Sequence, residues 1–146
     1  MENAERRRPA FYYDQSGVIP IRREGDEVQV LLITSRRRKR WIIPKGIIER
    51  ELGPGASAEK EALEEAGVQG RMTASPIGTY TYRKWGGTCR VQVFILEVEE
   101  ILGSWREGAF RQRQWMRLEE AAALVDESEL KHLILGVPAF LASITR

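Results

Sequence analysis

Segments rich in β-branched and aromatic residues occur along this chain before, between and after segments typical of helices. The first two strand-like segments, FYYDQSGVIPIR and EVQVLLITSR, are separated by Gly25-Asp26, which suits a hairpin turn. Further strands are predicted near residues 71–82, 88–98 and 114–118, with RKWGG as the turn between the first two of these. Because strands that flank helices on both sides pack against them in layers, the sequence predicts a mixed α/β layered domain.

Helical segments are predicted in the middle and at the end of the chain. Ser57 is expected to cap the first helix, which should end at Gly67 in a left-handed conformation. Two later helical regions cover residues 118–125 and 127–145, and the second is interrupted near Gly136-Val137-Pro138. Short connections between these segments leave no place for a domain boundary.

Length and composition agree with a single globular unit. The 146 residues can bury an ordinary core, and the 42% hydrophobic and 30% charged residues are typical of a folded protein. We expect one domain over residues 10–146, after a flexible charged tail over residues 1–9. Cys89 is the only cysteine, so it excludes an intrachain disulfide and is expected in the core. Without a long apolar stretch or a secretory signal, we expect a cytoplasmic protein with no membrane partner.

The stretch KEALEEAG, residues 60–67, gathers three glutamates within five positions. On a helix that turns about 100° per residue, Glu61, Glu64 and Glu65 share one arc, while alanines occupy much of the opposite side. Like charges at this spacing destabilise a helix by roughly 0.2–0.5 kcal/mol per pair. A divalent cation would reverse that interaction, since Mg²⁺ and Mn²⁺ prefer oxygen ligands. The alternative is an ordinary solvated acidic face.

The segment before this helix favours the metal hypothesis. Lys45-Gly46 follows the strand-like WIIP, and the loop that leads to the helix contains Gly53 and Gly55. Glycines let a backbone approach an anionic ligand closely, and a lysine beside them supplies a positive charge for phosphate. The alternative is a plain connection between a strand and a helix.

The stretch from Gly46 to Val68, GIIERELGPGASAEKEALEEAGV, resembles the Nudix box, the loop–helix motif G-x5-E-x7-R-E-U-x-E-E-x-G-U of Nudix hydrolases. The residues that match in type and spacing are Gly46, Glu61, Glu64, Glu65, Gly67 and Val68. Leu52 and Lys60 stand where the family has a Glu and an Arg that brace the loop against the helix, and Ala62 is a small version of U. We expect Glu49 or Glu51 to take over the pairing with Lys60.

The resemblance extends over roughly residues 11–145, to the diphosphoinositol polyphosphate and dinucleoside polyphosphate branch of the family. It implies an α/β/α sandwich with a central mixed β-sheet and a reaction that splits a diphosphate linked to another group. It further implies that Glu61, Glu64 and Glu65 hold Mg²⁺ or Mn²⁺. Glu64 or Glu65 is then expected as the catalytic base, with Glu107 as a further candidate whose ordinary interpretation is an exposed loop residue.

Basic residues near these glutamates are candidates for binding substrate phosphates, because highly phosphorylated ligands need several cations. The candidates are Arg36, Arg38, Arg40, Lys45, Gly46, Arg111 and Arg113. The run from Arg36 to Arg40 has two other interpretations, a solvated hairpin tip and a non-specific attraction for nucleic acid. Of Arg111 and Arg113, at least one is expected to be simply exposed.

Three other residues are functional candidates by type, one histidine and two tryptophans. His132 is the only histidine, which excludes HExxH zinc sites and Ser-His-Asp triads, and it is expected on a helix surface. Trp41 and Trp115 could stack on a base, although a core position is favoured for Trp41 inside WIIP.

The sequence therefore predicts a metal-dependent pyrophosphohydrolase acting on a highly phosphorylated small molecule, of the diphosphoinositol polyphosphate or dinucleoside polyphosphate type. One alternative is an RNA 5′-pyrophosphohydrolase, since a basic surface would equally suit an RNA 5′ end. The other is a non-catalytic domain that binds a nucleotide or polyphosphate to regulate a partner. The substitutions at Leu52 and Lys60 support this last alternative, whereas the intact E-x-x-E-E argues against it. The oligomeric state is left open.

Overall fold

A long antiparallel hairpin begins the structure. The computed structural model describes residues 12–37 and 39–144, so the tail expected over residues 1–9 lies outside the described residues. Strand β1 (Tyr12–Glu24) pairs with β2 (Glu27–Thr34) through a turn at Gly25-Asp26, as the sequence predicted. Gly25 has φ +62°, a conformation that glycine adopts without strain from a side chain.

The hairpin belongs to a mixed sheet. Strand β7 (Gly87–Ile101) runs parallel to β1, and the other pairings are antiparallel. The main strand order is β3-β2-β1-β7-β5; β4 also pairs with β1, β6 with β7, and β8 with β2. The remaining strands are β3 (Trp41–Ile42), β4 (Lys45–Ile47), β5 (Val68–Met72), β6 (Gly78–Lys84) and β8 (Arg113–Arg117).

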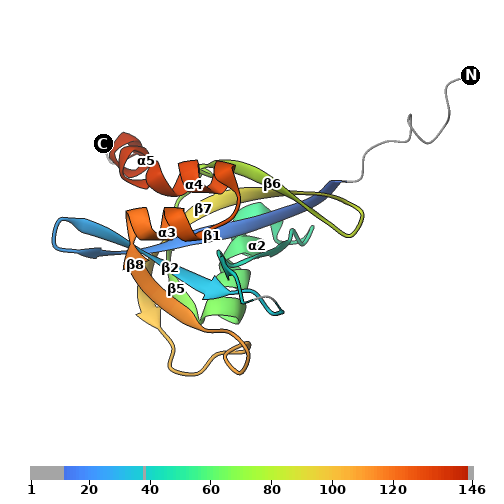
Figure 1. Cartoon of the computed structure of the whole chain (residues 1–146), viewed down its shortest axis with the longest axis horizontal. Coiled ribbons are helices and arrows are strands. Elements are labelled where there is room, and N and C mark those ends of the chain that lie inside the picture. Colours follow the sequence, from blue (N-terminus) through green and yellow to red (C-terminus); the bar gives the residue numbers. More distant parts are fainter. Residues whose placement is uncertain (1–11, 38, 145–146) are drawn as a thin grey trace, which may run out of the picture.

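Helices cover both faces of this sheet (Figure 1). Helix α2 (Gly53–Glu61) continues into the π-helical turn η1 (Ala62–Ala66) on one face, and α3 (Leu118–Leu124), α4 (Ser128–Leu135) and α5 (Val137–Ile144) cover the other. Successive strand residues alternate between two apolar cores, so Val18 packs beneath α2 and Ile19 packs towards α4. The three-layer α/β/α sandwich with a mixed sheet is therefore confirmed.

Two predicted boundaries were wrong. Ser57 does not cap α2, because the helix already begins at Gly53 with Pro54 in its first turn, where a missing N–H costs nothing. The Ser57 hydroxyl instead accepts a hydrogen bond from the Glu49 N–H (2.9 Å) and is buried. The strand predicted over residues 71–82 is interrupted between β5 and β6.

The end of the glutamate-bearing helix and the C-terminal helices follow the prediction. Gly67 ends η1 in the left-handed conformation, with φ +69°. The C-terminal helical region is interrupted at Gly136, between α4 and α5. Within the described ranges, no helix has both the length and the apolar character needed to cross a lipid bilayer.

Candidate active site

The sheet opens where β1 changes its neighbour. Residues 21–24 of β1 pair with β2, whereas residues 15–17 of the same edge pair with β4. A cleft of about 1040 Å³ lies at this end of the sheet. Its charged lining among the described residues comprises the cations Arg36, Arg37, Arg40, Lys45, Arg83, Lys84 and Arg111 and the carboxylates Glu61, Glu65 and Glu107. The cleft therefore combines an excess of positive charge with a small group of acids.

The acids are presented by the α2–η1 helix. Glu61 is the last residue of α2, and Glu64 and Glu65 lie in η1. Ala58 and Ala62 pack into the core and are fully buried, as predicted for the opposite side of the helix. This packing fixes the helix against the sheet and directs the acidic side towards the cleft end of the domain.

Glu61 and Glu65 are neighbours, and each carboxyl group affects the pKa of the other. Burial raises the pKa of Glu65 to about 8, with Arg111 opposing the shift and the neighbouring Glu61 adding to it. Burial is also the main cause of the raised pKa of Glu61. Two carboxyl groups at this distance cannot both ionise cheaply, so the pair holds either a proton or a cation between its oxygens.

Strand β4 contacts this pair from the other side. The Lys45 N–H donates a hydrogen bond to Glu65 Oε1 (3.2 Å), and the Lys45 ammonium lies 4.9 Å from the centre of the Tyr82 ring. Burial lowers the pKa of Lys45, while Glu65 opposes this shift. At Gly46 a β-carbon would overlap the Glu61 carboxylate, so a glycine permits the close approach of strand and acid.

The loop over residues 102–112 anchors the C-terminal end of the glutamate-bearing helix. The last carbonyl groups of a helix lack partners within it and must find them elsewhere. Here three of them accept hydrogen bonds, from Glu107 N–H to Glu64 O (3.0 Å), from Trp105 Nε1 to Glu65 O (2.9 Å) and from Arg113 Nη1 to Ala66 O (2.8 Å). The turn that carries Glu64 and Glu65 is therefore held in position at its C-terminal end.

Arg111 holds two of the acids in place. Only 8% of this residue is exposed, and its Nε donates to Glu107 Oε1 (2.7 Å) while Nη2 lies 3.7 Å from Glu65 Oε2. Its Nη1 donates to the carbonyl of Thr34 (2.9 Å), which ties the loop to the end of β2. Arg111 lines the cleft as predicted, but its first role in this structure is to position carboxylates.

Glu64 does not line the cleft with Glu61 and Glu65. Its carboxylate forms an ion pair with Arg106 (3.1 Å), a residue that the sequence analysis had not considered. In the part of the chain that the structure describes, no three acidic, cysteine or histidine side chains converge as a ready-made metal site. The donor set still suits Mg²⁺ or Mn²⁺, because these ions take carboxylate oxygens and the Glu61–Glu65 pair needs a positive partner.

The predicted phosphate-binding residues are only partly brought together. Arg36, Arg40, Lys45 and Gly46 line the cleft, although Arg40 also pairs with Asp126 (2.8 Å). Arg38 lies outside the described residues. Arg113 does not reach the cleft, because its guanidinium donates to the carbonyls of Ala66 and Leu102 (2.8 and 2.6 Å) and stacks 3.8 Å from the Trp105 ring centre. Its expected role as a phosphate ligand is therefore corrected to a structural one.

The end of β6 and the turn that follows it supply cleft residues that the sequence did not predict. Arg83 and Lys84 of β6 and Trp85 of the turn line the cleft, whereas the sequence predicts only a hairpin turn here. The pairing of Thr88 with Tyr12 brings this turn to the N-terminal end of β1, which is also where β4 pairs. The sequence feature that could have indicated a cleft position is the pair of cations beside an aromatic residue in RKWGG.

Other expectations are resolved by the packing. Trp41 packs against the core beneath α3 and α4, Trp115 packs against the core beneath α2, and neither lines the cleft, so base stacking is not supported for them. Cys89 is fully buried and His132 is exposed on α4, as predicted. Lys60 Nζ pairs with Glu49 Oε2 (2.6 Å), one of the two partners expected for it.

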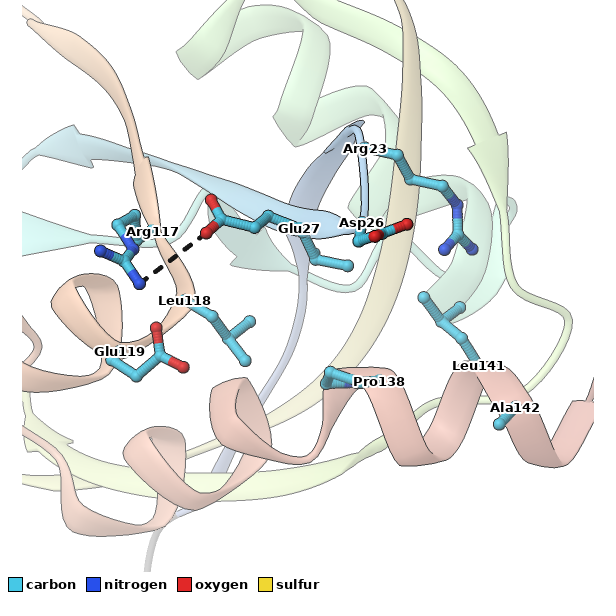
Figure 2. A pocket seen from close by; sticks show the side chains of 10 residues that line it. Arg23, Asp26, Glu27, Arg117, Leu118, Glu119, Pro138, Leu141 and Ala142 are labelled. Atoms are coloured by element: carbon cyan, nitrogen blue, oxygen red, sulfur yellow. Dashed lines mark ion pairs between the residues drawn. The ribbon is translucent and has the colours of Figure 1, made fainter.

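A second, smaller hollow of about 430 Å³ lies between the β1–β2 hairpin and α5 (Figure 2). Figure 2 shows Arg117 and Glu27, which form an ion pair at 3.8 Å, on one side and Leu141 and Ala142 of α5 on the other. None of the predicted site residues lines it. The chemistry of the glutamates therefore belongs to the larger cleft.

Comparison with known proteins finds a matching family model and similar proteins. The family model described as the NUDIX domain matches residues 13–135. Nudix hydrolase 13, mitochondrial, of Arabidopsis thaliana is 35% identical over 131 residues, which are 75% of this chain and 65% of that protein. Diphosphoinositol polyphosphate phosphohydrolase 3-beta of Bos taurus is 32% identical over 115 residues, covering 77% and 69% of the two chains. The chain thus spans about two thirds of the length of these relatives.

Solved structures show the same fold. The binary complex of the C. elegans Ap4A hydrolase superposes with a TM-score of 0.72 at 22% identity and covers 90% of this chain and 99% of its own. A NUDIX hydrolase from Nitrosomonas europaea superposes with a TM-score of 0.68 at 17% identity and covers 88% and 90% of the two chains. At these identities the likeness establishes the architecture and leaves the substrate to be argued from the cleft.

Proposed function

This chain belongs to the NUDIX domain family of hydrolases, and we propose that it is a metal-dependent pyrophosphohydrolase that cleaves a diphosphate linkage in a highly phosphorylated small molecule. One observation carries the proposal: the Glu61–Glu65 pair lies in a cleft whose charged lining is mostly cationic. Acids alone would repel a phosphate chain, and cations alone would bind it without reaction. The combination suits a polyanion that is held by the cations while one phosphorus atom lies at the acids.

The cations are distributed over two segments of the chain. Arg36, Arg37 and Arg40 come from the β2–β3 connection, and Arg83 and Lys84 come from the end of β6. Arginine can contact a phosphate through two nitrogen atoms at once, which fixes its orientation as well as its position. Two cationic segments can therefore bind different phosphates of one substrate.

Glu61, Glu64 and Glu65 are the residues that would hold Mg²⁺ or Mn²⁺. When bound, such an ion neutralises charge that develops on the phosphate oxygens during hydrolysis. Glu107 lies beside this group, held by Arg111, and Glu65 lines the same cleft. Glu65, Glu64 and Glu107 are thus the candidates for accepting the proton of the attacking water.

Two similar proteins are named for their substrates, a diphosphoinositol polyphosphate phosphohydrolase and an Ap4A hydrolase. Both substrates carry several phosphates, as the cationic lining requires. An RNA 5′ end remains the alternative substrate, and binding without turnover remains the alternative function.

The test is the release of phosphate or nucleotide from dinucleoside polyphosphates, inositol pyrophosphates and 5′-triphosphate RNA, with Mg²⁺ or Mn²⁺ and with a chelator. We expect turnover of at least one of the small molecules, and its loss on chelation. Tight binding without turnover of any substrate would contradict the enzyme assignment, and turnover of the RNA alone would favour the RNA alternative.

A charge-reversal series tests the cationic lining. Arg36→Glu and Arg37→Glu should each raise KM, with the largest effect on the most highly phosphorylated substrate. Lys39→Glu is the matched control, since Lys39 lies in the same connection and does not line the cleft. Equal effects of the three substitutions would show that only the net charge matters.

A further inference from the structure

Trp85 has a backbone conformation that tryptophan rarely adopts. The β6–β7 turn has two residues, Trp85 with φ +57° and Gly86 with φ +71°, between the paired residues Lys84 and Gly87. Positive φ at both central residues defines the type I′ turn, in which Asn-Gly is strongly preferred. A bulky residue in the left-handed region is an uncommon, strained choice. Hairpin stability therefore does not explain a tryptophan here.

Packing does not explain it either. The residue is 54% exposed, and Trp85 is among the large apolar side chains that the core leaves out. Tyr13 meets the indole edge-on, with ring centres 5.2 Å apart, and its hydroxyl donates to the Trp85 carbonyl (3.2 Å). These contacts fix the turn against the start of β1 and still leave more than half of the residue accessible.

The exposed indole lines the polar cleft, beside cations suited to phosphate. Lys84 Nζ lies 4.8 Å from its ring centre, and Arg83 precedes it on β6. An accessible aromatic ring next to a cationic groove is the arrangement with which proteins bind nucleotides, because a base stacks on the ring while the cations hold the phosphates.

We propose that Trp85 stacks on a nucleobase of the substrate while Arg83 and Lys84 bind the adjoining phosphates, so that the cleft selects nucleoside polyphosphates. The inference rests on the proposed function in that it places a phosphorylated substrate in the same cleft. An inositol polyphosphate has no aromatic ring and gains nothing from the indole. Trp85 is thus a specificity-determining residue.

Phe110 is the other exposed aromatic residue of the cleft and serves as a comparison. It is 37% exposed, and the guanidinium groups of Arg36 and Arg111 lie 4.7 and 5.9 Å from its ring centre. Because two cations lie at the Phe110 ring, less of its surface is accessible to a base. Phe110 is therefore assigned a smaller part in discriminating between ligands.

The test compares the binding of ATP and inorganic tripolyphosphate, which carry the same number of phosphates, by calorimetry on the full chain in the presence of a chelator. Trp85→Asn places the preferred Asn-Gly pair in the turn, so the fold should be kept while the ring is lost. We expect wild type to bind ATP more tightly, Trp85→Asn to lower ATP affinity roughly 5- to 100-fold, and tripolyphosphate affinity to stay within about twofold. Trp85→Phe should retain most of the preference, and Phe110→Ala should change it less than Trp85→Asn does.

Equal affinity of wild type for the two probes would overturn the inference, as would equal losses for both probes in Trp85→Asn. Because no turnover is measured and no metal is present, this outcome is independent of whether the protein hydrolyses anything. Failure of the hydrolase assignment appears instead as binding without product release in the substrate panel.

Discussion

The ammonium group of Lys60 lies 2.6 Å from the carboxylate of Glu49 and pairs the α2 helix with the loop that precedes it. The pairing takes the place of the brace that the family motif builds from an arginine and a glutamate at the positions of Lys60 and Leu52. Leu52 itself is 44% exposed and precedes α2. The brace between loop and helix is therefore kept. Lys60 replaces the arginine, and the glutamate lies at position 49 in place of position 52.

Removing this brace should have a small, salt-dependent effect. Glu49→Gln is expected to lower the melting temperature by roughly one to a few degrees at low salt, since exposed ion pairs contribute little and are screened. Glu51→Gln is the control, because Glu51 is exposed in the same loop. Thermal unfolding of both variants at low and high salt measures the difference. A loss for Glu49→Gln that persists at about 1 M salt would show that the residue acts in another way.

Arg106 should compete with a metal ion for Glu64. The Arg106–Glu64 ion pair has to break before that carboxylate can join Glu61 and Glu65, and Arg106 is 73% exposed. Removing an exposed ion pair of this kind should increase Mn²⁺ affinity about two- to fivefold in Arg106→Ala. Calorimetric titration with Mn²⁺ measures it, with Arg23→Ala as a control, because Arg23 lies at the other end of β1 and pairs with Glu97. Weaker Mn²⁺ binding by Arg106→Ala would contradict this competition.

The buried Glu65 should make the metal-free protein less stable as the pH rises. Its pKa of about 8 in the folded state exceeds the ordinary value of 4.5, so the folded protein keeps a proton that the unfolded chain releases. Its contribution is fully present below pH 4.5 and is lost as the pH rises towards and through 8. Urea unfolding with a chelator should show a slope of at most about 1.4 kcal/mol per pH unit from this proton.

Glu65→Gln should remove that slope, because the amide does not titrate. Glu59→Gln, on the exposed side of α2, should keep it. The prediction is wrong if wild type and Glu65→Gln lose stability equally between pH 5 and 8.

Substitution of Arg113 should affect stability alone, and substitution of Arg83 should affect substrate binding alone. Arg113→Met removes the hydrogen bonds to Ala66 and Leu102, so the free energy of unfolding should fall by about 2 kcal/mol with KM unchanged. Arg83→Met should raise KM several-fold and leave the free energy of unfolding unchanged, since Arg83 is exposed at the cleft. Urea unfolding and steady-state kinetics on both variants test the pair. The opposite pattern would return Arg113 to the phosphate-binding group.

Local patterns predicted the fold well because they report local causes. Gly25 and Gly67 were placed correctly, since each supplies a positive φ that its turn or helix end requires. Ser57 was misplaced because serine suits a helix start by propensity, whereas Pro54 had already fixed the first turn. Two competing indications of a helix start cannot be ranked from their residue types alone.

The site was predicted less completely because tertiary contacts decide which cations line the cleft and which hold other groups. Nothing in FRQRQW distinguishes Arg111, which holds Glu65 and Glu107, from Arg113, which holds helix carbonyls. Trp85 follows Glu65 by 20 positions and reaches the same cleft through the parallel pairing of β7 with β1, a long-range contact that no local pattern records.

If the acids of the α2–η1 helix carry out hydrolysis, kcat at saturating Mg²⁺ on the best substrate of the panel should depend on Glu64. We expect Glu64→Gln to lower kcat roughly 100-fold or more while melting as wild type does. Glu59→Gln removes a charge from the same helix outside the acidic group and should leave kcat within about twofold. Turnover by Glu64→Gln equal to that of Glu59→Gln would contradict the account.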